Sequence, residues 1–361
     1  MKIAVVYRYF APDTPPYAIM LEKMTAWLAA EGHDVEVHPA YKPEAAIPQQ
    51  PWRDMRNGVH IRRFWLLPER ARGMVRAFNS LCFVLRAAAN ILFGPRRDLV
   101  WTATMPPVIQ AFLLCAVAKL RGARFLYHMQ DIYPEVAEAT GTRFSPPLAW
   151  CLRRLDNWTL RHADACVVLS TDMADTIRSR VDENARLAII NNFALATSEE
   201  AAKIRDGKPV RFLFAGNIGR YQSLPELVKA FAGVPAGDAE LVLLGEGALK
   251  AELIKLAEGM GHVRFLDHVP AAEAFRQMQS AHYGIVSLVP GLYRYAFPSK
   301  LLTYLAASLP VVAIIEPESR LAAMIRDNHL GHVLPSSNSP ADWGKALARI
   351  AETQDASAPL K

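Results

Sequence analysis

Two glycine-containing turns and one lysine in the second half of the sequence have the residue types needed to bind a phosphate group. In the run FAGNIG, Gly216 and Gly219 allow close approach of the backbone to a ligand before a helix begins. Pro298 and Ser299 begin another predicted helix, with Lys300 in its first turn. A cation beside a helix N-terminus is unfavourable unless an anion joins them. The pattern therefore predicts a diphosphate at Lys300; the alternatives are a plain tight turn and a surface lysine.

Four segments of this kind follow one another along the second half, each after an apolar, strand-like run. They are the turn at Gly216, the LGEG turn ending at Gly247, the FLDHV segment at 265–269 and the PSK helix start at Pro298. The carboxyl ends of parallel strands line one crevice in an open sheet. The order of the segments thus predicts a single ligand site.

A second group of reactive side chains lies in the run HMQDIYPE of the first half. His128, Asp131 and Glu135 follow a predicted strand, and residues at such strand ends point toward a cleft. Asp131 is the first candidate for orienting a reacting hydroxyl group, and His128 is the second. The alternatives are a helix N-cap for Asp131 and a core histidine for His128.

Alternating apolar and amphipathic segments predict an α/β protein with two domains. Strand-like runs occupy 2–7, 34–40, 99–104, 124–129 and 165–170, and then 210–217, 239–247, 262–269, 283–290 and 309–315. Near-continuous apolar strands separated by helices are typical of parallel sheets covered on both faces. We place the boundary at the charged stretch 198–208, which gives domains 1–197 and 198–361, with the last helix as a candidate for crossing back to the first domain.

Positive charge is concentrated in the first half of the chain. Residues 53–124 hold 13 basic and 3 acidic side chains, interleaved with aromatic residues, whereas residues 191–361 hold 17 of each sign. Such a basic and aromatic segment predicts contact with an anionic membrane surface. Nucleic acid is not expected as a partner, because no RNA-recognition motif or zinc finger accompanies the charge.

The most apolar stretch, 74–93, contains Arg76 and Arg86 and is followed by Gly94-Pro95. Two arginines at this spacing favour an amphipathic helix at a membrane interface over a spanning helix. The alternative is an ordinary domain helix with two solvated arginines. The chain start, MKIAVVYRYF, is typical of a first strand rather than a signal peptide. Together these features predict a cytoplasmic protein at the inner face of the cytoplasmic membrane.

These motifs together resemble glycosyltransferase family 4, in particular bacterial members that build surface polysaccharides. The resemblance covers nearly the whole chain: YFAP, EGHDVEV, QDIYPE, VVLS, NNF, FAGNIG, LGEG and PSKLLTYLAASLPVV. It implies the GT-B fold, two Rossmann-like doubly wound domains facing each other across a cleft. It also implies retaining transfer of a hexose or acetamido sugar from a nucleotide-diphosphate donor to a polyprenyl-diphosphate-linked or saccharide acceptor.

The resemblance implies particular site residues as well. The catalytic residues would be Asp131, His128 and Lys300, and the donor would be bound by Gly216, Asn217, Gly219, Arg220, Gly245, Glu246, His268, Val269, Pro298, Ser299, Lys300, Leu301 and Thr303. The acceptor would bind largely in the first domain. No metal or cofactor is implied, since the helix dipole and Lys300 take the place of Mg²⁺.

The sequence departs from the family pattern in two places. Thr303 stands where a glutamate usually holds the donor ribose, and Tyr295 stands where its partner glutamate would be. A threonine hydroxyl makes a weaker contact to a ribose diol than a carboxylate does. The glycine pair of the first loop is replaced by residues 13–17. The alternative function is therefore a catalytically degenerate protein that serves as a binding or scaffold subunit of a glycosyltransferase complex.

Overall fold

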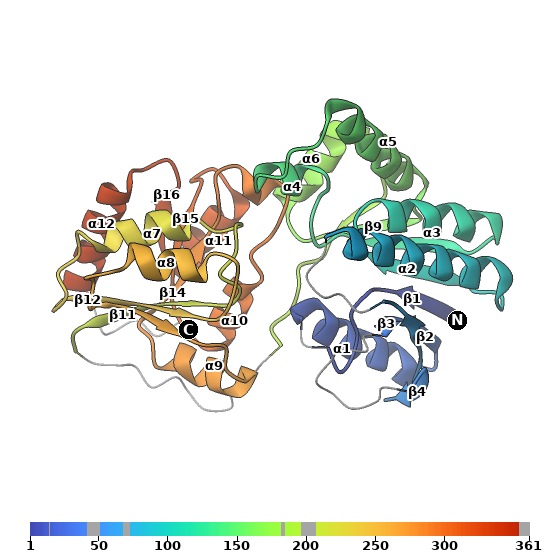
Figure 1. Ribbon diagram of the computed structural model, residues 1–361, viewed down its shortest axis with the longest axis horizontal. Helices are drawn as coiled ribbons and strands as arrows, with labels where there is room; N and C mark the ends of the chain where they lie inside the picture. Colours follow the sequence, from blue (N-terminus) through green and yellow to red (C-terminus); the bar gives the residue numbers. More distant parts are fainter. Residues whose placement is uncertain (14, 42–50, 68–72, 182–184, 196–206, 354–361) are drawn as a thin grey trace. The chain divides into compact units, whose positions relative to one another are not determined.

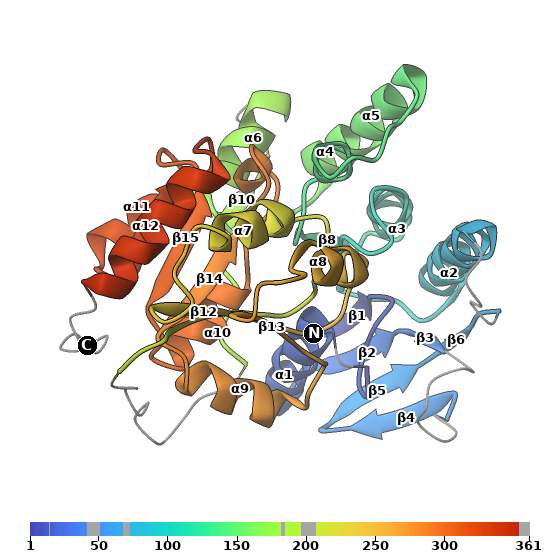
Figure 2. The same cartoon turned by 60° about the vertical axis from the view of Figure 1, so that its left-hand side comes forward.

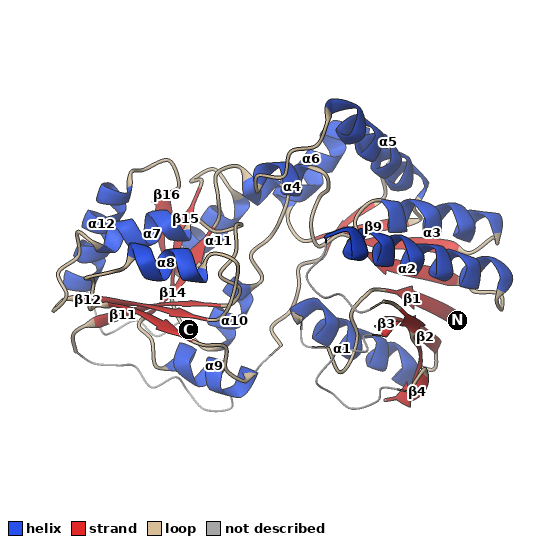
Figure 3. Cartoon of the chain, viewed as in Figure 1, coloured by secondary structure: helices blue, strands red, loops and turns tan. Residues whose placement is uncertain are grey.

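The computed structural model of the chain describes residues 1–13, 15–41, 51–67, 73–181, 185–195 and 207–353. It divides into two compact units, one made of Met1–Glu138 and Arg143–Asn191 and the other of Ala139–Thr142 and Asn192–Lys361. Most of the linker expected at 198–208 lies outside the described residues. Each unit has a sheet with helices packed against it (Figure 3), as the alternating apolar pattern predicted.

The first unit is built on an eight-stranded sheet in the order β10-β9-β8-β7-β1-β2-β5-β4. Its strands are β1 (Lys2–Val6), β2 (Asp34–His38), β4 (Arg53–Arg56), β5 (Val59–Arg62), β7 (Leu99–Ala103), β8 (Arg124–His128), β9 (Ala165–Val168) and β10 (Leu187–Ile189). All neighbours are parallel except β4 and β5. The strand order reverses between β1 and β7, and the crevice outside such a switch point is where open α/β sheets bind ligands.

Helices cover both faces of this sheet. Helix α1 (Pro16–Ala30) lies on one face, while α2 (Gly73–Phe93) and α3 (Ile109–Leu120) lie on the other (Figures 1 and 2). Three further helices, α4 (Glu135–Ala139), α5 (Pro146–His162) and α6 (Thr171–Val181), precede and follow β9. The inward side chains of β1 and β2, such as Val5 and Val37, are buried in one apolar cluster with Leu21 of α1. Apolar burial on both faces explains why these strands read as continuous apolar runs.

Part of the basic segment forms a hairpin that the sequence reasoning missed. Strands β4 and β5 are joined by Asn57 and Gly58, whose φ angles are 50° and 76°. An Asn-Gly pair with both φ angles positive is the two-residue turn that hairpins favour. Just beyond it, β6 (Phe64–Trp65) pairs with β3 (Ala40–Tyr41). The sequence signal for this hairpin is therefore the pair Asn57-Gly58, which lies within a highly charged segment.

Helix α2 meets the length and composition of a membrane span over Val75–Phe93. In the fold it packs on the first unit through one face, on which Phe83, Val84 and Ile91 are buried. Phe78, Leu81 and Leu85 are about half exposed and recur at helical spacing on its opposite face. Helix α2 therefore has apolar residues on both faces. Only one of these faces packs against other described residues.

The second unit has a six-stranded parallel sheet in the order β13-β12-β11-β14-β15-β16. Its strands are β11 (Val210–Ala215), β12 (Ala239–Leu244), β13 (Val263–Leu266), β14 (Tyr283–Ser287), β15 (Val311–Ile315) and β16 (Gly331–Pro335). The order reverses between β11 and β14. The loops after these two strands therefore flank the crevice at which a ligand is expected.

Helices also cover both faces of the second sheet. Helices α7 (Leu224–Phe231) and α8 (Lys250–Leu256) lie on one face and α9 (Ala271–Gln279) on the other (Figures 1 and 2), followed by α10 (Lys300–Ala306), α11 (Arg320–Asp327) and α12 (Pro340–Glu352). The crossing of the last helix back to the first domain stays a prediction; the last helix that the structure describes is α12. It packs against α7 of its own unit, where Gly344 approaches Ala230 so closely that a Cβ would lie 2.6 Å from its carbonyl oxygen.

Candidate functional site

The glycine turns after β11 and β12 are packed backbone to backbone. Gly245 has a φ of 140°, and a Cβ at this position would lie 2.1 Å from the Gly216 carbonyl oxygen. A Cβ at Gly247 would lie 2.2 Å from the Ile218 carbonyl oxygen. The Ile218 N–H donates to the Glu246 carbonyl at 2.8 Å. Only glycine fits this contact, so the LGEG turn fixes the shape of the FAGNIG turn beside it.

Lys300 lies at the start of α10 with its ammonium group directed toward the Gly216 turn. Its Nζ is buried, 3.4 Å from the centroid of the Phe214 ring, and 3.9 Å from where a Cβ at Gly216 would be. No group of the described residues accepts a hydrogen bond from this Nζ. Burial lowers the pKa of Lys300 from its ordinary value to about 7. The Phe214 ring offers partial compensation through its π face, whereas an anion would stabilise the charge directly.

The residues next to Lys300 differ in their burial and in their hydrogen bonds. Pro298 and Ser299 precede the helix, which begins at Lys300 itself. Leu301 has a fully buried side chain, and its N–H donates to the Pro298 carbonyl at 3.1 Å. The Leu301 side chain therefore packs in the core, and its part in donor binding stays a prediction. Thr303 is half-buried one turn further along α10.

The other two positions of the first donor loop, Asn217 and Arg220, are exposed. The Asn217 side chain folds over Gly219, where a Cβ would lie 2.7 Å from its Nδ2. Glycine at 219 thus keeps the Asn217 amide close to the turn. Arg220 makes no ion pair with the described residues. Both side chains are accessible to a ligand at the turn.

A lysine that the sequence reasoning missed links the turns after β12 and β13. Lys250 Nζ lies 2.6 Å from Glu246 Oε1 and 2.6 Å from Asp267 Oδ1. Both carboxylates hold the pKa of Lys250 above its ordinary value. His268 is exposed and Val269 is half-buried at the end of the same turn. The ion pairs join the two segments in which the resemblance assigns donor-binding residues, Glu246 in one and His268 and Val269 in the other.

In the first unit, His128 ends β8 beside the switch point and is 7% exposed. Its Nδ1 lies 2.9 Å from the Tyr17 hydroxyl, and its Nε2 lies 3.1 Å from Gln130 Nε2. Because an amide nitrogen only donates, Nε2 accepts and the ring is neutral with its proton on Nδ1. Burial lowers the pKa of His128 to about 4. These contacts give His128 the surroundings of a satisfied core histidine, which was the alternative interpretation.

Asp131 follows β8 and is not the N-cap of the next helix. Helix α4 begins at Glu135, so its N-cap position belongs to Pro134. The Asp131 carboxylate makes no hydrogen bond or ion pair with the described residues, and burial raises its pKa from 3.8 to about 6. Asp131 is half-buried and follows β8, the strand next to β7. A carboxylate without a hydrogen-bond or ion-pair partner among the described residues, at the carboxyl edge of such a sheet, is available to a ligand.

Glu135, the third predicted polar residue, belongs to an ionic network. Arg153 and Arg180 donate to its two carboxylate oxygens at 3.1 and 3.2 Å. Arg180 also donates to the fully buried Asp156 at 2.6 Å. Glu135 is therefore occupied in tying α4 to α5 and α6, which fixes the segment that carries Asp131.

No metal site is evident in the part of the chain that the structure describes, because no three His, Cys, Asp or Glu side chains gather there as potential ligands. The positive groups near the sheet edge of the second unit are instead Lys300, Lys250 and Arg220.

Comparison with known proteins identifies the family. A family model described as Glycosyl transferase 4-like domain matches residues 17–192, and one described as Glycosyl transferases group 1 matches residues 209–353. The glycosyltransferase WbjE of Pseudomonas aeruginosa is 26% identical over 78% of this chain and 72% of its own. The protein assigned as colanic acid biosynthesis glycosyl transferase WcaI of Escherichia coli K12 is 24% identical over 94% of each chain.

Solved structures share the fold. Anabaena HepE in complex with UDP superposes with a TM-score of 0.67 at 14% identity, covering 100% of this chain and 92% of that one. At this identity the likeness concerns the fold alone. The family models span both units, with the paired turns and Lys300 in the second match and His128 and Asp131 in the first. The chain therefore belongs to glycosyltransferase family 4, with the two Rossmann-like domains of the GT-B fold.

Proposed function

We propose that this protein is a retaining glycosyltransferase that moves a sugar from a nucleotide-diphosphate donor to a lipid-linked or saccharide acceptor in bacterial surface glycan synthesis. The second unit binds the donor and the first binds the acceptor. The sugar is a hexose or an acetamido sugar. The relatives support the biological setting, because one of them is assigned to the biosynthesis of a surface polysaccharide, colanic acid.

One observation carries the proposal: the buried ammonium group of Lys300 beside the Gly216 turn. A buried ammonium with no hydrogen-bond partner among the described residues costs stability unless an anion accompanies it. The position at the β11/β14 switch point suits a diphosphate, which supplies several acceptor oxygens. HepE has the same fold and binds UDP, which supports a nucleoside diphosphate as the ligand.

The chemistry that follows is mainly positioning and charge stabilisation. As the bond from the sugar to the diphosphate breaks, negative charge grows on the leaving oxygens, and Lys300 stabilises that charge in a low-dielectric site. The leaving diphosphate accepts the proton of the incoming hydroxyl on the same face of the sugar. Asp131 orients that hydroxyl, and Lys300 takes the place of a metal ion in this proposal. Each group acts by being held in place before the reaction.

The acceptor and the location are part of the same proposal. The half-exposed apolar residues Phe78, Leu81 and Leu85 of α2 suit the interfacial region of a membrane, with the basic residues of the first unit attracted to anionic lipids. These features support the proposal that the enzyme works at the inner face of the cytoplasmic membrane on a polyprenyl-diphosphate-linked acceptor.

The test is binding of UDP, GDP and their sugars, followed by thermal unfolding. A ligand that binds only the folded protein raises its apparent stability in proportion to its affinity. Lys300→Met removes the charge at nearly constant volume and is expected to weaken binding about 100-fold, the loss of a strong charge-assisted hydrogen bond. Lys255→Met, at an exposed lysine of α8, is the matched control. The proposal fails if no nucleotide binds, or if both variants bind as the wild type does.

Thr303 and Tyr295 support a second candidate, a catalytically degenerate binding or scaffold subunit. Both lack the carboxylate that the family usually places at these positions. Thr303→Glu separates the candidates: a large gain in transfer or donor hydrolysis indicates a decayed enzyme, whereas a loss shows that threonine belongs to a working site. Thr303 is half-buried on α10, whereas Leu301 on the same helix lies in the core.

A further inference from the structure

The first unit contains a pocket that the proposed donor and acceptor residues do not use. It has a volume of about 540 Å³ and lies where the β4–β5 hairpin, β6 and α2 meet. It is lined by Trp52, Arg53, Arg62, Arg63, Phe64, Trp65 and Arg86. We call it the arginine pocket. Four guanidinium groups and three aromatic rings line it, and no carboxylate does.

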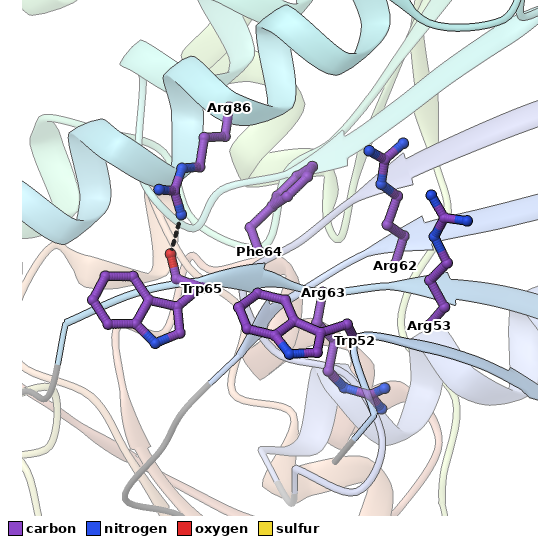
Figure 4. A pocket seen from close by; sticks show the side chains of 7 residues that line it. All are labelled: Trp52, Arg53, Arg62, Arg63, Phe64, Trp65 and Arg86. Carbon is purple, nitrogen blue, oxygen red and sulfur yellow. Dashed lines mark hydrogen bonds between the residues drawn. The ribbon is translucent and has the colours of Figure 1, made fainter. Parts of the chain in front are cut away.

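The arginines of the pocket have different roles (Figure 4). Arg63 is 4% exposed and donates to the carbonyls of Pro51 and Ala11 at 3.0 and 2.9 Å. It therefore holds the wall of the pocket. Arg86 reaches from α2 and donates to the Trp65 carbonyl. This bond leaves the other donors of the Arg86 guanidinium available.

Arg53 and Arg62 form the cationic centre of the pocket. They are registered partners directly opposite each other in the β4–β5 pair, and their side chains extend side by side (Figure 4). Like charges at directly opposite positions destabilise a hairpin. Asp34, Glu36 and Asp54 line a neighbouring pocket with them, but none forms an ion pair with Arg53 or Arg62. The pair thus has an unbalanced charge that a bound anion would offset.

The arrangement of the guanidinium groups in the arginine pocket suits a ligand with phosphate groups. Guanidinium groups bind phosphate oxygens through paired parallel hydrogen bonds, and two adjacent groups match the two phosphates of a diphosphate. The exposed indoles of Trp52 and Trp65, 54% and 37% accessible, offer apolar surface next to the charge. The half-exposed residues Phe78, Leu81 and Leu85 add apolar surface on α2, the helix that carries Arg86.

We propose that the arginine pocket binds the diphosphate of a polyprenyl-diphosphate-linked acceptor, with the polyprenyl chain leaving past the indoles toward the membrane. This rests on the proposed function and narrows its acceptor class to a lipid diphosphate. Arg53 and Arg62 bind the phosphates, Arg86 adds a third cation, and Arg63 positions the wall. None of these residues bonds to the reacting sugar.

The experiment measures binding to vesicles in the Lys300→Met background, so that phosphate binding at the proposed donor site is strongly weakened. Neutral phosphatidylcholine vesicles carry either polyprenyl diphosphate or phosphatidylglycerol at equal surface charge. The protein is expected to bind the polyprenyl diphosphate vesicles about tenfold more tightly, and the double variant Arg53→Gln, Arg62→Gln loses that preference. Arg76→Gln, which removes an exposed arginine of α2 outside the pocket, keeps it.

Three results would overturn the proposal: equal binding to both vesicle types, a preference that survives in the double variant, or an equal loss in Arg76→Gln. The first would indicate attraction to a phospholipid surface only. Inorganic pyrophosphate gives an independent measurement, because it should raise the melting temperature of the Lys300→Met protein and not that of the protein with both further substitutions. The melting temperature without pyrophosphate shows that the variant is folded. Since the donor site is already weakened, failure here leaves nucleotide binding by the unmodified protein intact.

Discussion

The two anion sites inferred for this protein use opposite strategies. At Lys300 a single buried ammonium faces a glycine turn whose shape is fixed by backbone contacts, and its pKa is lowered to about 7. In the arginine pocket several guanidinium groups from a hairpin and from α2 lie together. Burial makes the first site selective and sensitive to pH. Exposure makes the second tolerant of sequence change and sensitive to salt.

The largest effect is expected from a substitution that disturbs the backbone contact between the Gly245 and Gly216 turns beside the proposed donor site. Gly245→Ala adds a Cβ 2.1 Å from the Gly216 carbonyl oxygen at a φ of 140°. We expect it to destabilise the protein by about 3 kcal/mol or more and to abolish nucleotide binding. The measurement is denaturant unfolding.

Gly259→Ala is the matched control for this substitution. Gly259 also has a positive φ, 84°, but nothing lies within 4 Å of its missing Cβ. The expected cost is about 1 kcal/mol, with nucleotide binding retained. Equal effects of the two substitutions would show that the contact between the turns is unimportant.

A second effect concerns stability and pH. The pKa of Lys300 is about 7 in the folded protein and 10.5 in an unfolded chain. Between pH 7 and pH 10.5 the Lys300 amine is protonated in the unfolded chain but mostly neutral in the folded protein. The free energy of unfolding therefore increases as pH rises through this range. From pH 7 to 9 the free energy of unfolding should rise by about 2 kcal/mol more in the wild type than in Lys300→Met. Parallel profiles for the two proteins would mean that Lys300 stays charged.

The smallest effect is expected at the arginine pocket. Replacing Arg53 and Arg62 by glutamine relieves the repulsion between directly opposite like charges. We expect the ligand-free protein to gain about 0.5 kcal/mol of stability at low salt and less at high salt. Thermal unfolding at two ionic strengths measures this. A loss of stability would indicate that the pair is already neutralised within the hairpin.

The sequence predicted the strands of both sheets and the helix start at Lys300 because those features are local. Every strand expected from an apolar run is present, and Lys300 lies at a helix start beside the Gly216 turn. In the run PSK and in the glycine turns, the residue types that suit phosphate binding lie within a few neighbouring positions. Such local patterns can be interpreted without knowing which residues pack against them.

What the sequence could not show depends on contacts between distant residues. The Lys250 bridge between Glu246 and Asp267 joins the segments after β12 and β13, and the role of Leu301 in the core follows from burial. The arginine pocket combines a hairpin with α2. The positive charge of this segment is evident from the sequence. The register that places Arg53 opposite Arg62 is set by the Asn57-Gly58 turn.

The central claim is that Lys300 binds the donor diphosphate as an ammonium ion. It is tested most directly by calorimetric titration with a nucleoside diphosphate at pH 8 in buffers of different ionisation enthalpy. At this pH the free Lys300 amine is mostly neutral and the phosphate is fully ionised, so binding as an ion pair must take up a proton. The wild type should take up about one proton per ligand, and the weaker residual binding of Lys300→Met should take up none. Equal proton uptake by the two proteins, or no uptake by the wild type, would contradict the claim.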